Sequence, residues 1–228
     1  MAILSAYRTT VGKKIVMAVT GLIWVGYVVL HMFGNLKFFN GAGDGLGTIN
    51  AWAHFLRVFG QEVVGYAGVL WLARVVLLVA LVLHVATAIQ LKRLNGASRP
   101  VAYQRRGYLQ TDLPARSMWW GGVFILMFVV YHVLHMTAGT VHPAFVEGDV
   151  FHNLTVGLGE PLAGAFYLTA MVALGLHLYH GTWSVFQTLG VDVFDRSSAI
   201  RRAGQALALV IAGGFMLVPL SILLGFMR

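Results

Sequence analysis

Long uninterrupted runs of apolar residues are the feature of this sequence that most constrains its fold. A membrane-spanning helix needs about 20 predominantly apolar residues to cross roughly 30 Å of hydrocarbon, and five runs reach that length. They cover about residues 15–39, 63–91, 117–138, 161–189 and 203–227. The sequence therefore predicts an all-α membrane protein, in which five transmembrane helices form one bundle and a single domain over residues 1–228.

Composition supports lipid as the solvent and limits the chemistry. Hydrophobic residues make up 58% of the chain and charged residues only 11%, against about 25% charged in soluble domains. The chain has no cysteine. This excludes disulfides, thiol catalysis and iron–sulfur clusters held by this chain alone. Any metal site must therefore use histidine, carboxylate or methionine.

Charged residues lie almost entirely between the apolar runs and divide unequally between the two sides. Cytoplasmic loops carry an excess of Lys and Arg. One side collects Arg8, Lys13, Lys14, Lys92, Arg93, Arg99, Arg105, Arg106, Arg116, Arg196, Arg201 and Arg202. The other side holds Lys37, Arg57, Arg228 and the acidic residues Asp44, Glu62, Glu147, Asp149 and Glu160. This asymmetry predicts a cytoplasmic N-terminus and an external C-terminus.

The net charge of +8 therefore reflects membrane topology, and we expect no nucleic-acid partner. A basic cytoplasmic face would instead dock a soluble protein or anionic lipid headgroups. The connections between the runs are a possible short interfacial helix at 54–61, a polar basic loop at 94–114, a long loop at 142–160 and a short loop at 191–202.

Nine histidines in so apolar a chain need an explanation. Six of them lie inside the predicted spans, at His31, His84, His132, His135, His177 and His180. An ionisable residue within a membrane is a functional candidate by default. The alternative is a neutral histidine that bonds a backbone carbonyl or a serine. Six such residues on four successive helices favour a shared function.

Distance along each helix sorts the histidines into two layers. At 1.5 Å per residue, His31 and His132 both lie about 24–25 Å from the inner side. His84 lies about 12 Å from that side, and His177 falls in the same inner half. Two imidazoles on facing helices at one depth are what a six-coordinate haem requires.

Other metal or proton chemistry fits less well. Zinc or copper would need three or four ligands at one depth. A proton-coupled transporter usually adds intramembrane carboxylates to its histidines, and these spans contain almost none.

Three further intramembrane residues are candidates for secondary contacts. His135 and His180 each follow another histidine by three residues, on roughly the same helix face, where they could bond a haem propionate or a quinone. Arg74 is the only clear charge near a span interior and needs an anionic partner, for which a haem propionate is the natural candidate. The alternative for Arg74 is a side chain that reaches the outer interface.

Four motifs resemble one known family. They are HMFGNL at 31–36, His84 with NGASRP at 95–100, YHVLH at 131–135, and the most specific, HLYHGTWSVFQTLG at 177–190. Together they resemble the cytochrome b membrane anchor of succinate:quinone oxidoreductases (succinate dehydrogenase or fumarate reductase), in the type where one chain of five helices holds two haem b groups. The motifs cover four of the five spans.

The resemblance implies one axial iron ligand on each of the first four spans. His84 with His177 would hold the haem nearer an iron–sulfur subunit, and His31 with His132 the haem nearer the outside. In family members His135 and His180 occupy variable positions, so the resemblance gives them no role.

The resemblance also implies partners and a location. A flavoprotein subunit would carry the succinate chemistry, and an iron–sulfur subunit would pass electrons to this chain, which would deliver them to membrane quinone, often menaquinone. The complex would lie in a bacterial cytoplasmic membrane as part of the respiratory chain and the tricarboxylic acid cycle, and it could form a higher oligomer. Glu62 is our candidate proton carrier for the quinone; the alternative is an ordinary interfacial carboxylate.

Two rival functions remain open from the sequence. One is the dihaem cytochrome b subunit of a hydrogenase or a formate dehydrogenase. The other is a transporter or an anchor without haem.

Overall fold

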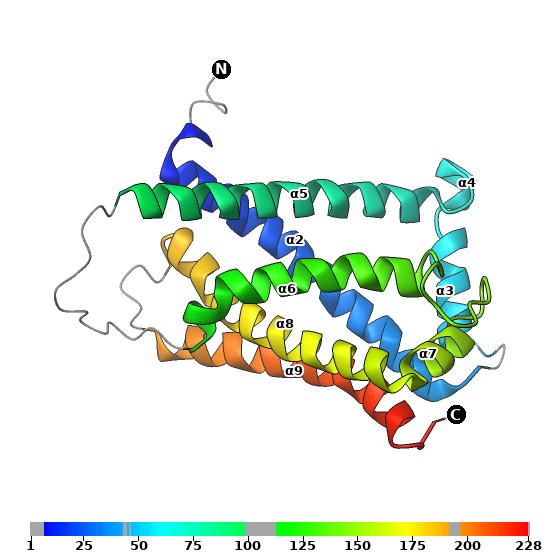
Figure 1. The fold of residues 1–228 in the computed structure, drawn as a ribbon. Helices are drawn as coiled ribbons and strands as arrows, with labels where there is room; N and C mark the ends of the chain where they lie inside the picture. Colours follow the sequence, from blue (N-terminus) through cyan, green and yellow to red (C-terminus); the bar gives the residue numbers. More distant parts are fainter. Residues whose placement is uncertain (1–6, 43–44, 46, 99–112, 192–196, 228) are drawn as a thin grey trace.

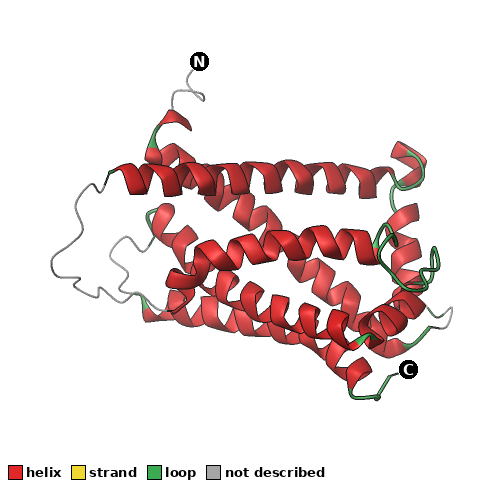
Figure 2. Ribbon diagram, in the orientation of Figure 1, coloured by secondary structure: helices red, strands yellow, loops and turns green. Residues whose placement is uncertain are grey.

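The computed structural model describes residues 7–42, 45, 47–98, 113–191 and 197–227. Within these ranges the chain forms helices joined by loops and turns, and no strand (Figure 2). Most of the predicted basic loop at 94–114 lies outside the described residues, as do Asp44, Arg196 and Arg228.

Five long helices form the body of the molecule (Figure 1). They are α2 Thr10–Leu36, α5 Gly68–Ala97, α6 Leu113–Met136, α8 Pro161–Thr188 and α9 Ser198–Leu223. Each is long and apolar enough to cross a membrane. The predicted all-α membrane fold with five spans is therefore confirmed.

Local capping chemistry explains where several helices begin. The Thr9 hydroxyl accepts a hydrogen bond from the Gly12 backbone N–H at 2.9 Å, which satisfies a donor that the first turn of α2 leaves unpaired. Pro161 occupies the first turn of α8, where its missing N–H costs nothing. These are signals that the sequence carries at short range.

The second long helix begins five residues after the approximate start predicted at residue 63. The segment Gln61–Val64 forms a separate short helix, α4, and α5 begins only at Gly68. Between them Gly65 and Ala67 take positive φ angles of 79° and 57°. A positive φ ends a right-handed helix, so the chain turns here before it enters α5.

The predicted loop at 142–160 was wrong in part, because it contains the helix α7, Val150–Gly159. Asp149 caps this helix by accepting a hydrogen bond from the His152 backbone N–H at 3.0 Å. The Asn50 side chain donates to Asp149 Oδ1 and accepts from the Phe151 N–H, each at 3.0 Å. Asn50 lies in α3, Ile49–Val58, so it ties α3 to α7.

The predicted interfacial helix at 54–61 is present in displaced form as α3. A 3-10 turn, η1 Lys37–Asn40, joins the end of α2 to the loop before α3. In Figure 1, α3, α4 and α7 gather at one end of the bundle, which we call the α7 end.

Packing between the long helices is uneven. Helix α8 packs against α9 and α6, while α5 packs mainly against α2. In Figure 1, α2 crosses the bundle diagonally and α5 lies along its edge. The α7 end holds a core cluster made of Phe38, Ile49, Leu154, Leu158, Tyr167, Val218 and Ile222.

Basic side chains contact aromatic rings at the end of the bundle opposite to α7. Lys92 Nζ lies 3.3 Å from the centroid of the Trp119 ring, and the Arg201 guanidinium lies 4.2 Å from that of Trp183. The Lys13 ammonium donates to the backbone oxygens of Tyr7 and Arg8. The charge asymmetry thus separates the two ends of the bundle, and a cytoplasmic N-terminus stays a prediction.

Candidate functional site

Four intramembrane histidines form two facing pairs between neighbouring helices. His31 of α2 and His132 of α6 have ring centroids 5.8 Å apart. His84 of α5 and His177 of α8 have ring centroids 6.3 Å apart. These are the two combinations expected from depth and from the family motifs. We call them the near pair (His31, His132) and the far pair (His84, His177), by their distance from the α7 end.

Two glycines mark the level of the far pair on α2 and α6, and so allow the distance between the two pairs along the bundle to be derived. A Cβ added at Gly21 of α2 would lie 3.6 Å from His84, and one at Gly122 of α6 would lie 3.7 Å from His177. The near-pair histidines follow these glycines by ten residues in each helix, at His31 and His132. Ten residues correspond to about 15 Å of helix. The two pairs therefore lie in two layers, separated by about half of the thickness of the membrane's hydrocarbon core.

The spacing within each pair fits one metal ion between two rings. A bond from a metal to an imidazole nitrogen is about 2.0 Å long, and the ring centroid lies roughly 1 Å behind that nitrogen. Two imidazoles on opposite sides of one iron therefore place their centroids about 6 Å apart. The measured values of 5.8 and 6.3 Å agree with this arrangement.

In the far pair, a hydroxyl fixes which nitrogen of His84 is available. Thr20 Oγ1 donates its one hydrogen to the Val16 carbonyl oxygen at 2.8 Å. The same oxygen lies 3.2 Å from His84 Nδ1, so it must accept a hydrogen from that nitrogen. A neutral His84 then carries its hydrogen on Nδ1 and leaves the lone pair of Nε2 free for a metal.

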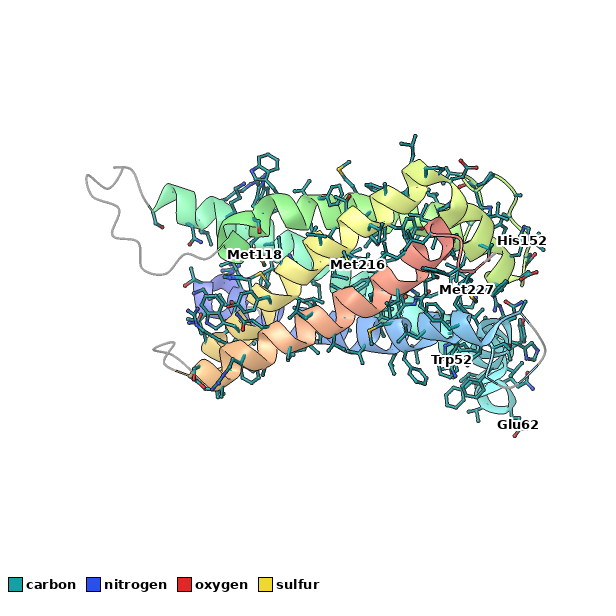
Figure 3. The ribbon with its side chains drawn as sticks, turned by 90° about the horizontal axis from the view of Figure 1, so that it is seen from below. Trp52, Glu62, Met118, His152, Met216 and Met227 are labelled. Atoms are coloured by element: carbon teal, nitrogen blue, oxygen red, sulfur yellow. The ribbon has the colours of Figure 1, made fainter. Side chains whose placement is uncertain are left out.

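His177 completes the far pair on the opposite side. Its Nδ1 is buried and has no hydrogen-bond partner among the described residues, a situation that costs free energy. His177 also lines a cavity of about 290 Å³ between α6 and α8. The other residues that line it are Ser117, Met118, Trp120, Gly121, Phe124, Thr169, Val172, Ala173 and Leu176. Met118 is labelled in Figure 3. A buried polar atom beside an apolar cavity suits a prosthetic group.

In the near pair, aromatic rings surround both histidines. The His31 ring stacks on Tyr27 at 5.3 Å and contacts Phe215 at 5.6 Å. His132 Nδ1 lies 3.2 Å from the Tyr167 hydroxyl. Both histidines line a cavity of about 130 Å³, whose other lining residues are Asn35, Met136, Thr137, Val150, Asn153 and Leu154.

His135 and His180 lie apart from the two cavities. His135 is 1% exposed, and its Nδ1 lies 3.1 Å from the same Tyr167 hydroxyl that His132 contacts. The His180 ring contacts the edge of Trp183, with centroids 5.0 Å apart. His135 thus reaches the near pair through Tyr167.

A polar network covers His135 at the α7 end. Its ring lies 4.9 Å from that of His142. His142 Nε2 donates to the Asn153 carbonyl oxygen at 2.8 Å, and His142 Nδ1 accepts the Ala144 N–H at 3.1 Å. Both nitrogens of a neutral His142 are therefore used. The Asn153 side chain donates to and accepts from the Val146 backbone, at 2.8 Å each, so the loop before α7 is fixed.

Arg74 and Glu62 lie at the surface of the described structure. Arg74 is exposed, with its guanidinium 4.8 Å from the centroid of the Trp71 ring. Glu62 is exposed in α4 and lies at the periphery of the molecule in Figure 3. Neither residue lines the two cavities. Their assignments to a propionate and to a quinone stay predictions.

Thr20 and Tyr167 are the functional candidates that the sequence reasoning missed. Each is one hydroxyl residue within an apolar span, with no motif around it. Their importance comes from the helix that they face, which the sequence does not give. The described residues also hold no group of three or more His, Cys, Asp or Glu side chains that could bind a metal ion, so the candidate site consists of pairs.

Comparison with known proteins adds no relative: no family model, no curated protein and no solved structure matches the chain. The resemblance to the cytochrome b anchors therefore depends on the sequence motifs, and the site depends on the geometry of the two histidine pairs.

Proposed function

We propose that this chain is a dihaem cytochrome b, the membrane anchor of a succinate:quinone oxidoreductase in a bacterial cytoplasmic membrane. The observation that carries the proposal is the presence of two facing histidine pairs with centroids 5.8 and 6.3 Å apart. Layers about 15 Å apart along α2 and α6 would give electrons a path across much of the bilayer.

In this proposal the protein supplies ligands, orientation and an apolar environment. Haem held by two imidazoles would supply electron transfer and would leave no position for oxygen. His84 and His177 would hold one iron, and His31 and His132 the other. Thr20 and Tyr167 orient His84 and His132, and the apolar spans keep water from the pairs.

The remaining redox groups would belong to partner chains. This chain has no cysteine for an iron–sulfur cluster and no soluble domain among the described residues for a flavin. The bundle end opposite to α7 carries Lys92, Arg93, Arg201 and Arg202. We propose that this end faces the cytoplasm and docks the iron–sulfur subunit, which in turn binds the flavoprotein.

Quinone would react near the α7 end in this proposal. The cavity of the near pair has polar residues, among them Asn35 and Thr137, in its lining. These side chains supply hydrogen-bonding groups for a quinone oxygen, and menaquinone is the quinone that the family resemblance suggests. Glu62, at the surface of α4, would act only at the membrane interface.

The test is the haem content of the purified chain. We expect a reduced-minus-oxidised spectrum with haem b bands and two haems per chain in a pyridine haemochrome assay. A spectrum without haem bands would favour the haem-free anchor or transporter, and one haem per chain would contradict the two pairs.

Co-purified subunits separate the remaining rival. A flavoprotein together with an iron–sulfur protein would support the succinate:quinone oxidoreductase. A hydrogenase or formate dehydrogenase catalytic subunit would contradict it and leave the dihaem assignment intact.

A further inference from the structure

Tyr167 places one hydroxyl between two imidazole rings. The residue lies in α8 and is 7% exposed. Its hydroxyl oxygen is 3.2 Å from His132 Nδ1 and 3.1 Å from His135 Nδ1, both on α6. These two nitrogens are its only hydrogen-bond partners within the described part of the chain.

Counting hydrogens shows that the two histidines must differ. A phenol has one hydrogen and can donate it to only one ring nitrogen. The Nδ1 atom of the other histidine must then donate its own hydrogen to the phenol oxygen. Without that hydrogen, the nitrogen and the oxygen would both be acceptors, and no hydrogen bond would join them. If both rings donated, the phenol hydrogen would be buried without an acceptor, which is unfavourable. The least costly arrangement has one donated and one accepted hydrogen, so neutral His132 and His135 are opposite tautomers.

The surroundings decide the direction of the two hydrogen bonds. His132 faces His31 and lines the near-pair cavity. His135 is not among the residues that line that cavity, and its ring contacts those of Tyr131 and His142. A ligand that uses Nε2 must carry its hydrogen on Nδ1. His132 therefore donates to Tyr167, and Tyr167 donates to His135.

We propose that Tyr167 is a positioning residue that holds His132 in the tautomer able to bind iron through Nε2, and that His135 anchors Tyr167 and is not a ligand. This inference depends on the proposed function. The chain of hydrogen bonds runs from His132 Nδ1–H to the Tyr167 oxygen and from Tyr167 O–H to His135 Nδ1. Each bond polarises the next, which makes His132 a stronger electron donor.

The test is a redox titration of the full-length chain with the variant Tyr167→Phe. The variant keeps the ring and removes the hydroxyl, so both haems should remain bound. A less basic His132 stabilises ferric iron less. We expect the midpoint potential of one haem to rise by about 59 mV. For a one-electron couple, this corresponds to about a tenfold change in the ratio of oxidised to reduced iron. The other haem should keep its potential.

The matched control is Tyr131→Phe, which removes a hydroxyl from a ring that stacks on His135. It should leave both potentials unchanged. His135→Leu, which removes the acceptor at the end of the chain, should raise the same potential as Tyr167→Phe does. The variant His135→Asn, which returns an acceptor oxygen near Nδ1, should restore it in part.

Two results would overturn the inference. One is unchanged potentials in Tyr167→Phe, and the other is the loss of a haem in either His135 variant, which would make His135 a ligand. Failure of the proposed function is distinct, because it would show as the absence of haem from the unmodified chain.

Discussion

The two histidine pairs share one chemistry but differ in how the protein supports them. The near pair lies among Tyr27, Phe215 and Tyr167, under the polar network of α7. The far pair joins α5 and α8, and α5 packs mainly against α2. Thr20 gives the far pair one hydrogen bond, and His177 Nδ1 has none among the described residues. Several side chains thus hold the near pair, whereas the far pair keeps one buried imidazole nitrogen without a partner among the described residues.

If the chain is the dihaem cytochrome proposed above, the replacement of a far-pair histidine should have the greatest consequence. His84→Ala and His177→Ala should each lose half of the bound haem, because one imidazole cannot replace two axial ligands. The near pair should keep its haem, since it lies about 15 Å away along α2 and α6. A pyridine haemochrome assay measures the haem per chain.

The control for this deletion is His54→Ala, which removes an exposed histidine of α3. It should keep the full haem content. Full haem in both far-pair variants would show that the ligand assignment is wrong.

The next prediction concerns protein stability and tests how tightly the residues beside the near pair are packed. A Cβ at Gly157 of α7 would lie 2.6 Å from His142 Nε2 and 2.9 Å from His135 Cε1. Because both rings are held by hydrogen bonds, Gly157→Ala should destabilise the protein by about 1–3 kcal/mol. Thermal unfolding in detergent measures the loss.

The matched variant beside the far pair is Gly122→Ala. Its Cβ would lie 3.7 Å from the His177 ring, which is an ordinary contact distance. Its effect on stability should stay below about 1 kcal/mol. Equal losses in the two variants would remove the contrast between the pairs.

A smaller effect probes the hydrogen bond between Thr20 and His84 in the far pair. Thr20→Val keeps the shape of the side chain and removes the acceptor for His84 Nδ1–H. The haem affinity of the far pair should fall by about tenfold, as measured by haem titration of the haem-depleted chain. Thr155→Val is the control, because that hydroxyl donates only to the Phe151 carbonyl within α7. A fall of the same size in the control would contradict the role of Thr20.

The smallest effect depends on pH and concerns the cap of α7. Hydrogen bonds from the His152 backbone N–H and from Asn50 lower the pKa of Asp149 below its ordinary value of 3.8. A lowered folded-state pKa stabilises the protein above pH 3.8, and this contribution is lost as the pH falls through the folded value. Asp149→Ala should therefore cost about 1 kcal/mol at neutral pH and progressively less in acid.

Unfolding midpoints of Asp149→Ala and of the unmodified chain between pH 7 and pH 3 give this difference. Glu147→Ala, which removes an exposed carboxylate from the same loop, is the control. A destabilisation that does not depend on pH would contradict the capping role of the Asp149 carboxylate.

From the sequence alone, the five spans and the layers of four histidines could be predicted. The reason is that both are properties of one helix at a time. Apolar length sets a span, and the fixed rise per residue converts position along a helix into depth. His31 and His132 could thus be placed in one layer, and His84 and His177 in the other, before any contact between helices was known.

The contacts between side chains of different helices became visible in the folded structure. The positive φ angles of Gly65 and Ala67 separate α4 from α5 and leave Glu62 at the surface. The hydroxyls of Thr20 and Tyr167 reach histidines on other helices, 64 and 35 residues away along the chain. Rotation about a helix axis and the choice of neighbour depend on how all the helices pack together, and a pattern along one helix contains neither.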